Sequence, residues 1–314
     1  MQQQRQWGSN VAVDRITFRA TMAQVSVPSS SANIGPGFDC FGIALEMRDQ
    51  YAASILDDAE FDVDVTGEGA DEVKKDKNNL VIKSMLRGFE HMGTKPRGIA
   101  LRALNVTPHQ RGLGSSSSAI IGGLVLARKL VLSGEDLLND DDVIALATEL
   151  EGHPDNVSAA FLGGATISWT ESGIGKATKL DVDERIKAIA FIPENHLSTK
   201  KARNVLPESI AHHDAVMNSA RTALLTQALT SRPDLLFTAT EDFLHQSYRA
   251  ELMPKSYALV SKLRAAGVAA VISGAGPTVL VLHAGTDQDA DDIIHAAGAG
   301  FEAKKVAISS NGAI

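Results

Sequence analysis

Residues Arg111–Ala127 read RGLGSSSSAIIGGLVLA, a glycine- and serine-rich segment that runs directly into an apolar one. Glycines permit a tight backbone turn with inward-pointing N–H groups, and the serines add hydroxyl donors at the expected first turn of a helix. Since a helix N-terminus attracts anions, the segment predicts a site for a phosphate chain. A flexible linker has a similar composition, but it would not continue as an apolar run of helical length.

This segment is not one of the common phosphate loops. The pattern GxxxxGK[ST] requires a lysine before the hydroxyl residue, whereas Gly114 is followed by serines, and GxGxxG does not fit after Arg111. Without that lysine, we expect a triphosphate to be neutralised by backbone dipoles, a serine-held divalent cation and basic residues from elsewhere. The segment therefore favours a kinase.

The composition narrows the class of protein. With 314 residues, of which 44% are hydrophobic, the chain is globular, and two domains are the better expectation. A formal net charge of -8 argues against a nucleic-acid partner. The single cysteine, Cys40, cannot form an internal disulfide and suggests a reducing compartment.

Two segments of the sequence are candidate signals for export or for membrane insertion, and neither fits. The start of the chain, Met1–Arg15, lacks the apolar core of a secretory signal, and we expect it to be a loosely ordered lead-in. The nearly uncharged run Ala265–Thr286 contains glycines, a proline and clustered valines, which fit strand, turn and strand better than a membrane helix. We therefore expect a cytoplasmic protein.

The first half mixes strands and helices without a regular alternation, which favours an α+β fold. We expect a rigid polar loop over SSSANIGPGFD, residues 29–39, and a polar turn over HPDN, residues 153–156. Asp142 is the expected N-cap and Gly152 the expected stop of one helix. The predicted strands are Ala23–Pro28, Tyr51–Leu56, Phe61–Val65, Gly98–Val106 and one ending near Trp169; the predicted helices are Asn79–His91, Ser115–Leu132 and Asp142–Glu151.

The polar, charged stretch Thr170–Arg185 is the best candidate for a domain boundary, and it divides the chain into residues 1–183 and 184–314. The second half should open with the strand Ile186–Ile192 and the basic loop STKKARNVLP. A strand, a Gly-rich turn and a strand follow over Val268–Leu282, and an acidic helix precedes a last strand, Lys305–Ser309. The further predicted helices are Asp214–Thr230, Pro233–Gln246 and Lys255–Ala266.

Three polar segments together resemble the motifs of one group of small-molecule kinases. PSSSANIGPGFDCFG (28–42), RGLGSSSSA (111–119) and SGAGPTVLV (273–281) are similar to the three motifs of the galactokinase, homoserine kinase, mevalonate kinase and phosphomevalonate kinase (GHMP) superfamily. EGHPDN, and TKKAR followed by YRAELMP, resemble its homoserine kinase family. The resemblance covers about residues 25–282.

This resemblance implies a two-domain GHMP-kinase fold. Its N-terminal domain would be α+β of the ribosomal protein S5 domain 2-like type, and its C-terminal domain a ferredoxin-like α/β plait. The resemblance also implies ATP and Mg²⁺ as cofactors, transfer of a phosphoryl group to L-homoserine on the route to threonine, and a homodimer. A kinase for another alcohol, such as mevalonate or a sugar, and a non-catalytic binding protein of the same fold remain alternatives.

Nucleotide binding is expected at both Gly-rich segments. SGAGP alone could be an ordinary β-turn, but beside the first segment it would close around the phosphates. Asn79 is a candidate for the base or ribose, because related chains have a similar NLV there. The expected nucleotide residues are Arg111, Gly112, Leu113, Gly114, Ser115, Ser116, Ser117, Ser118, Asn79, Gly274 and Gly276.

Two glutamates are candidates for holding the metal. Glu149 and Glu151 lie in the last turn of a predicted helix, where the macrodipole disfavours a carboxylate, so something should compensate one of them. Solvent is the simple account, and a Mg²⁺ ion shared with a serine hydroxyl is the sharper one. From the resemblance we expect Glu149 and Ser116, with Glu151 and Ser115 as alternates.

The substrate residues are expected at the other motifs. Asn33 and Asp39 suit an ammonium group, although both could merely cap turns. A guanidinium fork suits a carboxylate, unless the arginines sit in surface ion pairs, and a lone loop histidine is often a surface residue. The resemblance assigns substrate binding to Asn33, Asp39, His153, Asp155, Thr199, Arg203 and Arg249.

The catalytic centre is expected at Asn156, Ser116 and Glu149. Some relatives of the superfamily, such as mevalonate kinase, use an aspartate base near this region, whereas the homoserine kinase family lets the substrate hydroxyl attack directly. A loose phosphoryl-transfer transition state tolerates this, because positioning and charge neutralisation supply most of the catalysis. We therefore assign no general base.

Overall fold

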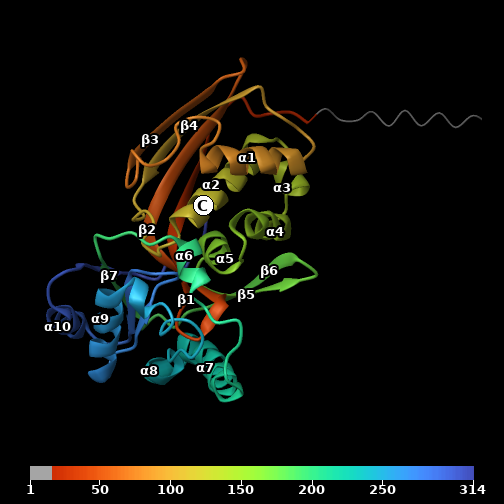
Figure 1. Cartoon of the computed structure of the whole chain (residues 1–314). Helices are drawn as coiled ribbons and strands as arrows, with labels where there is room; N and C mark the ends of the chain where they lie inside the picture. Colours follow the sequence, from red (N-terminus) through yellow and green to blue (C-terminus); the bar gives the residue numbers. More distant parts are fainter. Residues whose placement is uncertain (1–15) are drawn as a thin grey trace, which may run out of the picture.

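The computed structural model describes residues 16–314, which form two connected halves, each built on one β-sheet (Figure 1). The prediction for Met1–Arg15 lies outside the described residues. The first half comprises β1 (Ala23–Asn33), β2 (Gly37–Leu56), β3 (Phe61–Gly67), α1 (Leu80–His91), β4 (Gly98–Asn105), α2 (Ser115–Leu130), α3 (Gly134–Leu137), α4 (Asp140–Glu151), α5 (Asp155–Leu162), β5 (Ala165–Glu171) and β6 (Ile174–Leu180). The second half comprises β7 (Lys187–Ile192), α6 (Thr199–Asn204), α7 (His212–Thr230), η1 (Pro233–Leu235), α8 (Leu236–Ala239), η2 (Ala250–Leu252), α9 (Pro254–Ala265), β8 (Ala270–Ile272), β9 (Val279–His283), α10 (Asp287–Ala297) and β10 (Glu302–Val306).

Helix α2 lies at the centre of the first half, as its apolar sequence predicts. The sheet beside it has the order β3-β4-β2-β5-β6, with β1 paired to β2. Two mid-helix glycines let α2 approach its neighbours: a Cβ on Gly122 would lie 2.5 Å from the Tyr51 ring, and one on Gly123 would lie 2.4 Å from the Val81 carbonyl oxygen in α1. Such close backbone packing fixes where the helix, and hence its N-terminus, points.

The predicted polar loop over residues 29–39 is wrong for its first half. Ser29, Ser30 and Ser31 continue β1, and all three are fully buried. Serines are tolerated in this interior strand because their hydroxyls have partners: Ser30 Oγ donates to Asn156, and Ser31 Oγ bonds to Ser273. The turn itself is confined to residues 34–36, and β2 begins at Gly37.

The starts of several helices differ from the sequence prediction. The predicted basic loop STKKARNVLP is wrong in its first part, because Ser198 caps helix α6 there. Helix α4 begins at Asp140 because Asn139 is the N-cap, and Asp142 is instead the third helical residue that completes a capping box. Helix α5 was not predicted at all: the polar turn ends at Pro154, which lies at the N-cap, so Asp155 and Asn156 form the first turn of a helix. The predicted stop at Gly152 is confirmed by its left-handed backbone, with φ of 93°.

The second half has the ferredoxin-like strand order β10-β7-β9-β8, with all pairs antiparallel, which confirms the predicted plait. The predicted helix Pro233–Gln246 is wrong beyond Ala239. There the carboxylate of Asp242 accepts hydrogen bonds from the backbone N–H groups of Leu244, His245 and Gln246, and this local bonding replaces a helix.

The predicted boundary stretch is not a plain linker, because β6 lies within it and pairs with β5. The predicted last strand, Lys305–Ser309, has the wrong bounds, because β10 spans Glu302–Val306. The chain then returns to the first half, where Ile308 forms a bridge to Leu45 in β2. Ser26 and Ile314 exchange two backbone hydrogen bonds, so the C-terminus lies beside β1 (Figure 1). The last residues of the predicted domain 184–314 thus pack on the first half.

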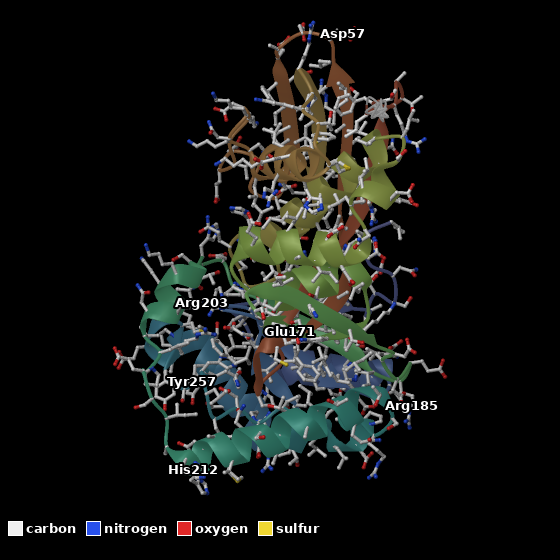
Figure 2. All side chains as sticks on the ribbon, turned by 90° about the vertical axis from the view of Figure 1, so that its right-hand side faces the viewer. Asp57, Glu171, Arg185, Arg203, His212 and Tyr257 are labelled. Atoms are coloured by element: carbon white, nitrogen blue, oxygen red, sulfur yellow. The ribbon has the colours of Figure 1, made fainter. Side chains whose placement is uncertain are left out.

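One hydrophobic cluster spans the two halves. It joins Phe41 and Ile43 of β2 to Ala188 of β7, Leu225 of α7 and Leu280 of β9. Figure 2 shows the resulting long molecule, with Asp57 at the tip of the first half and His212 at the opposite end. No helix within residues 16–314 is long and apolar enough to cross a membrane.

Candidate active site

The Gly-Ser loop is held between β1 and the second Gly-rich turn. Gly112 and Gly114 both have left-handed backbones, with φ of 76° and 72°. A Cβ on Gly114 would lie 2.1 Å from Ser30 Oγ, and one on Gly112 would lie 2.4 Å from the Ser273 carbonyl oxygen. Within the part of the chain that the structure describes, no side chain caps α2, so the N–H groups of its first turn are available to an anion.

Direct hydrogen bonds join the three motif segments. Ser273 Oγ donates to the carbonyl of Gly112 over 2.6 Å, and the amide of Asn33 donates to the carbonyl of Gly274 over 2.8 Å. The backbone N–H of Gly274 donates to Ala32. The three motif segments, which are far apart in the sequence, therefore form one continuous surface, the wall of a cavity.

A cavity of about 240 Å³ lies against this wall. All seven predicted substrate residues line it, together with Asn156 and Ser116. Of the predicted nucleotide residues, it is also lined by Gly112, Gly114, Ser115, Gly274 and Gly276. The predicted residues outside its lining are Arg111, Leu113, Ser117, Ser118, Asn79 and Glu149.

Glu151, and not Glu149, meets the serines. Glu151 Oε1 accepts hydrogen bonds from Ser116 Oγ over 2.7 Å and Ser117 Oγ over 3.1 Å. Glu149 pairs with Arg87 instead, over 3.0 and 2.9 Å, and this hydrogen bond lowers the pKa of Glu149. The structure thus brings Glu151, the alternate, and not Glu149 to Ser116. Residues two apart on a helix are separated by a rotation of about 200° around its axis, so they lie on nearly opposite faces.

The start of α5 forms a second polar group. The His153 ring and Asp155 Oδ1 are 2.7 Å apart, and Asp155 is almost fully buried. Burial alone would lower the pKa of His153, but the hydrogen bond and charge of Asp155, aided by Glu151, raise it overall. Asn156 accepts a hydrogen bond from Ser30 Oγ over 3.0 Å, which orients its amide beside the Gly-Ser loop.

Asp39 and Arg203 join the two halves. The guanidinium of Arg203 in α6 donates two hydrogen bonds to the Asp39 carboxylate, over 2.9 and 2.5 Å, and this pairing raises the pKa of Arg203. Asp39 and Asn33 both have left-handed backbones, and Asn33 Oδ1 accepts the Asp39 N–H. Thr199, at the start of α6, completes this side of the cavity.

Arg249 is a buried cation, only 1% exposed. It donates to the carbonyl oxygens of Ala202 and Gly274 and to the His245 ring, and within residues 16–314 it forms no ion pair with a carboxylate. Burial, and then the nearby charge of Arg203, lower its pKa to about 10. An unpaired buried ion costs on the order of several kcal/mol, so the position of this arginine is costly for the fold.

Asn79 has a capping role. Its Oδ1 accepts the Val81 N–H at the start of α1, and its amide donates to Lys74. It borders a mainly apolar cavity of about 230 Å³ that shares His109, Ser115 and Ser116 with the cavity at the Gly-Ser loop. Thr107 Oγ1 lies buried there without a partner in the described residues.

Other predicted serines and cations have structural partners. Ser118 bonds to the buried Tyr51 hydroxyl, which bonds to Asp49. The guanidinium of Arg111 donates to the Glu194 carbonyl and lies near His196. Sequence reasoning missed Phe38, His109 and His245, although each lies within four residues of a residue that it singled out.

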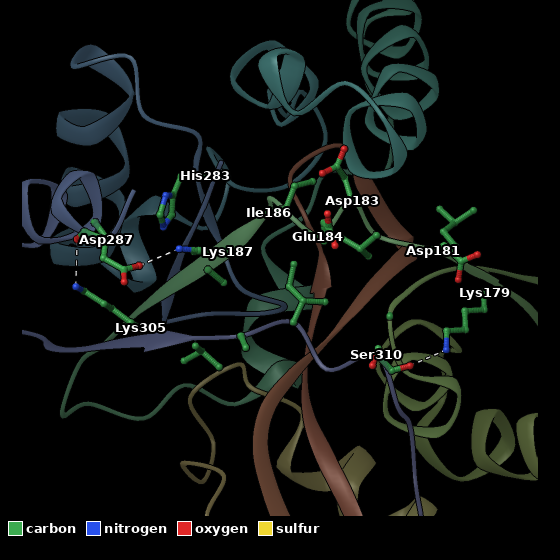
Figure 3. Close-up of a pocket in the computed structure, with 18 residues that line it drawn as sticks. Lys179, Asp181, Asp183, Glu184, Ile186, Lys187, His283, Asp287, Lys305 and Ser310 are labelled. Carbon is green, nitrogen blue, oxygen red and sulfur yellow. Dashed lines mark hydrogen bonds and ion pairs between the residues drawn. The ribbon is translucent and has the colours of Figure 1, made fainter. Parts of the chain in front are cut away.

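A separate cavity of about 550 Å³ lies between β6 and the second sheet (Figure 3). Its lysines have protein partners: Lys187 pairs with Asp287, and Lys179 donates to the Ser310 carbonyl. It contains none of the predicted site residues.

Fold and site together are those of a small-molecule kinase. Residues 79–164 match the family described as GHMP kinases N terminal domain, and residues 220–303 match GHMP kinases C terminal. The chain belongs to the GHMP kinase family. It is similar to the homoserine kinase of Streptomyces avermitilis, with 45% identity over 94% of this chain and 96% of the relative, and to that of Streptomyces coelicolor, with 46% identity over 94% and 95%.

Solved structures share the fold. The crystal structure of homoserine kinase from Cytophaga hutchinsonii superposes with a TM-score of 0.79 at 24% identity, over 95% of this chain and 99% of that one. The L. major mevalonate kinase, solved in complex with R-mevalonate, superposes with a TM-score of 0.66 at 14% identity, over 94% and 98%. The two-domain GHMP fold expected from the motifs is confirmed.

Proposed function

We propose that this protein is an ATP-dependent homoserine kinase, which converts ATP and L-homoserine to ADP and O-phospho-L-homoserine on the route to threonine. One observation carries the proposal. A single cavity is lined by the N-terminus of α2 and, elsewhere on its wall, by two arginines with the Asn33–Asp39 turn. We call these two parts the phosphate end and the amino-acid end of the cavity. The first suits phosphates, and the second suits the carboxylate and ammonium of an amino acid.

The reaction is a direct in-line transfer. The side-chain hydroxyl oxygen of homoserine attacks the γ-phosphorus while the bond from that phosphorus to the β–γ bridging oxygen breaks, and ADP leaves. The hydroxyl proton passes to the transferred phosphoryl group or to water. Asn156 would orient the hydroxyl beside the Gly-Ser loop, and positioning supplies most of the catalysis because the transition state is loose.

Mg²⁺ would be held by Ser116 and Glu151. Their oxygens converge at 2.7 Å on the cavity wall, and hard oxygen ligands are what this ion prefers. No group of three or more acidic, histidine or cysteine residues within residues 16–314 could hold a metal, which fits an ion that completes its shell with phosphate oxygens and water. When bound, the ion neutralises phosphate charge.

The nucleotide base would occupy the apolar cavity beside Asn79. This cavity opens onto Ser115 and Ser116 of the phosphate end, and the unpartnered hydroxyl of Thr107 offers a hydrogen bond there. Asn79 would shape this pocket by capping α1. Gly112, Gly114, Gly274 and Gly276 would let the backbone approach the phosphates.

The amino acid would lie at the other end. Arg249 and Arg203 would bind its carboxylate, Asp39 and Asn33 its ammonium group, and Thr199, His153 and Asp155 would complete the pocket. The motif resemblance further suggests a cytoplasmic homodimer, for which light scattering is the direct test.

A panel assay tests the proposal. Purified protein with Mg-ATP should release ADP much faster with L-homoserine than without it, and faster than with mevalonate or galactose. A preference for mevalonate or a sugar would instead assign the sister activity, and undetectable binding of Mg-ATP by calorimetry would indicate a non-catalytic protein.

A further inference from the structure

His245 is a fully buried histidine in the turn between α8 and η2, four residues before Arg249. Its Nε2 lies 2.9 Å from the carbonyl oxygen of Gly35, and its Nδ1 lies 3.0 Å from Nη1 of Arg249. Gly35 belongs to the turn between Asn33 and Asp39. The ring therefore touches the substrate segment of the first half and the arginine of the second half at once.

The chemistry of the two partners fixes the state of this ring. A guanidinium only donates and a carbonyl only accepts, so both contacts require a neutral imidazole with its proton on Nε2. The surroundings agree: burial lowers the pKa of His245, the carboxylate of Asp242 opposes this, and the charge of Arg249 lowers the pKa again. His245 is thus an acceptor for Arg249 and not a second cation.

Phe38 also contacts His245 and Arg249. Its ring lies 5.3 Å from the His245 ring, tilted by 30°, and its centroid is 5.3 Å from Cζ of Arg249 and 5.4 Å from Cζ of Arg203. Stacking on an aromatic face restrains a guanidinium, and a cation–π contact stabilises its charge where water is excluded. Both arginines are therefore oriented by one aromatic platform.

These contacts use most of the hydrogen-bond donors of Arg249, but not all. Nε donates to the Ala202 carbonyl, and Nη1 donates to His245 and to the Gly274 carbonyl. Within residues 16–314 no protein acceptor is bonded to Nη2, and Arg249 lines the cavity. The acceptor on His245 therefore determines which nitrogen of the fork is left for a ligand.

We infer that His245 is a positioning residue for substrate binding: by accepting from Nη1 it turns Nη2 of Arg249 toward the carboxylate of the substrate, and by donating to Gly35 it holds the Asn33–Asp39 turn in register with that arginine. This inference rests on the proposed function, since it gives Arg249 the carboxylate. Substrate selection then depends on a residue that touches no substrate.

Kinetics of four variants test the inference: His245→Leu, His245→Asn, Arg249→Ala and the double variant His245→Leu/Arg249→Ala. His245→Leu removes both contacts and should raise the KM for L-homoserine about tenfold or more, with the KM for ATP changed less than about twofold. His245→Asn keeps an acceptor near the position of Nδ1 and should restore most of the affinity. In the Arg249→Ala background, His245→Leu should raise this KM less than it does in the unmodified protein, because only the contact with Gly35 remains to be lost.

A substrate without the carboxylate separates positioning from folding. The unmodified protein and His245→Leu should differ much less with 3-aminopropan-1-ol than with L-homoserine, because this alcohol has no carboxylate for Arg249 to bind. His212→Leu, at an exposed histidine on the far end of the molecule (Figure 2), is the matched control and should change neither KM. Thermal melting and Mg-ATP calorimetry report the integrity of each variant.

Three outcomes would overturn the inference: additive effects in the double variant, equal losses in the KM for homoserine and ATP, or an equal loss with 3-aminopropan-1-ol. If His245→Leu does not fold, His245→Gln replaces it. Gln can reach the Gly35 carbonyl but lacks an acceptor near the position of Nδ1. The KM for L-homoserine should therefore be higher in His245→Gln than in His245→Asn, and a lower KM in His245→Gln would contradict the inference. If the unmodified protein does not use homoserine at all, the proposed function fails and the inference falls with it.

Discussion

The two ends of the cavity are built in different ways. The phosphate end comes mainly from one contiguous segment, Gly112–Ser116, braced by Ser30 and Ser273. The amino-acid end is made of side chains from separate parts of both halves, including Asp39, Arg203 and Arg249. A contiguous loop carries its geometry in its own sequence, whereas a composite pocket exists only after the halves have packed together.

This contrast has a chemical counterpart. Phosphates are common to all nucleotide-dependent relatives, and backbone N–H groups at a helix start bind them without any particular side chain. An amino acid is recognised by charge and direction, which require oriented arginines and carboxylates. We therefore expect damage to the first end to abolish activity and damage to the second end to change the KM for homoserine selectively.

The largest effect is expected from Gly114→Ala at the phosphate end. The backbone at Gly114 is left-handed, and a Cβ would lie 2.1 Å from Ser30 Oγ, so the loop must move. We expect kcat/KM for ATP to fall about a hundredfold or more, measured by ADP release.

Gly173→Ala is the matched control for this substitution. Gly173 is also left-handed, with φ of 81°, but a Cβ there meets nothing within 4 Å. It should keep full activity at a small cost in stability. Equal losses in the two variants would mean that backbone strain, and not the phosphate loop, explains the effect.

At the amino-acid end, Arg249→Ala should raise the KM for L-homoserine by about 10- to 100-fold while the KM for ATP changes little, because the lost hydrogen bonds are charge-assisted. Steady-state kinetics with each substrate varied in turn measure this. Arg232→Ala removes an exposed arginine whose side chain pairs with Asp234, and it should be neutral. A similar rise in the KM for L-homoserine and in the KM for ATP would show that Arg249 does not bind the substrate carboxylate.

A pair of glutamates tests the proposed Mg²⁺ site. Glu151→Gln should raise the Mg²⁺ concentration for half-maximal activity by about tenfold, since Glu151 contacts Ser116. Glu149→Gln should leave it unchanged, because Glu149 contacts Arg87. If Glu149→Gln raised the Mg²⁺ requirement and Glu151→Gln did not, the assignment of the ion to Glu151 would be refuted.

The smallest effect concerns His153, whose pKa is raised although burial opposes this, because Asp155 and Glu151 favour the charged ring. Its contribution to stability is then full below the ordinary histidine pKa of 6.5 and is lost as pH rises through the raised value. The stability advantage over His153→Gln should therefore shrink from about pH 5.5 to about pH 8.5 in urea unfolding. An advantage that grows with pH would contradict the assigned interaction.

The same contrast explains what could be predicted from the sequence. The Gly-Ser loop, α2 and the strand–turn–strand near Gly274 were readable because periodicity and turn residues are local signals. The choice between Glu149 and Glu151 required the rotation of α4 relative to α2, which spacing to His153 does not specify. The hydrogen bonds of the buried Ser30 and Ser31 with Asn156 and Ser273 join segments more than 120 residues apart, and so does the contact between His245 and Gly35. No local sequence pattern encodes such contacts.

The central claim is that one cavity brings the phosphate chain of ATP to the hydroxyl of an amino acid. Phosphorus NMR of a reaction with Mg-ATP and L-homoserine tests it most directly. We expect a phosphomonoester signal, identified as O-phospho-L-homoserine, to grow in step with ADP. ADP accompanied only by inorganic phosphate, or no ADP at all, would contradict the account.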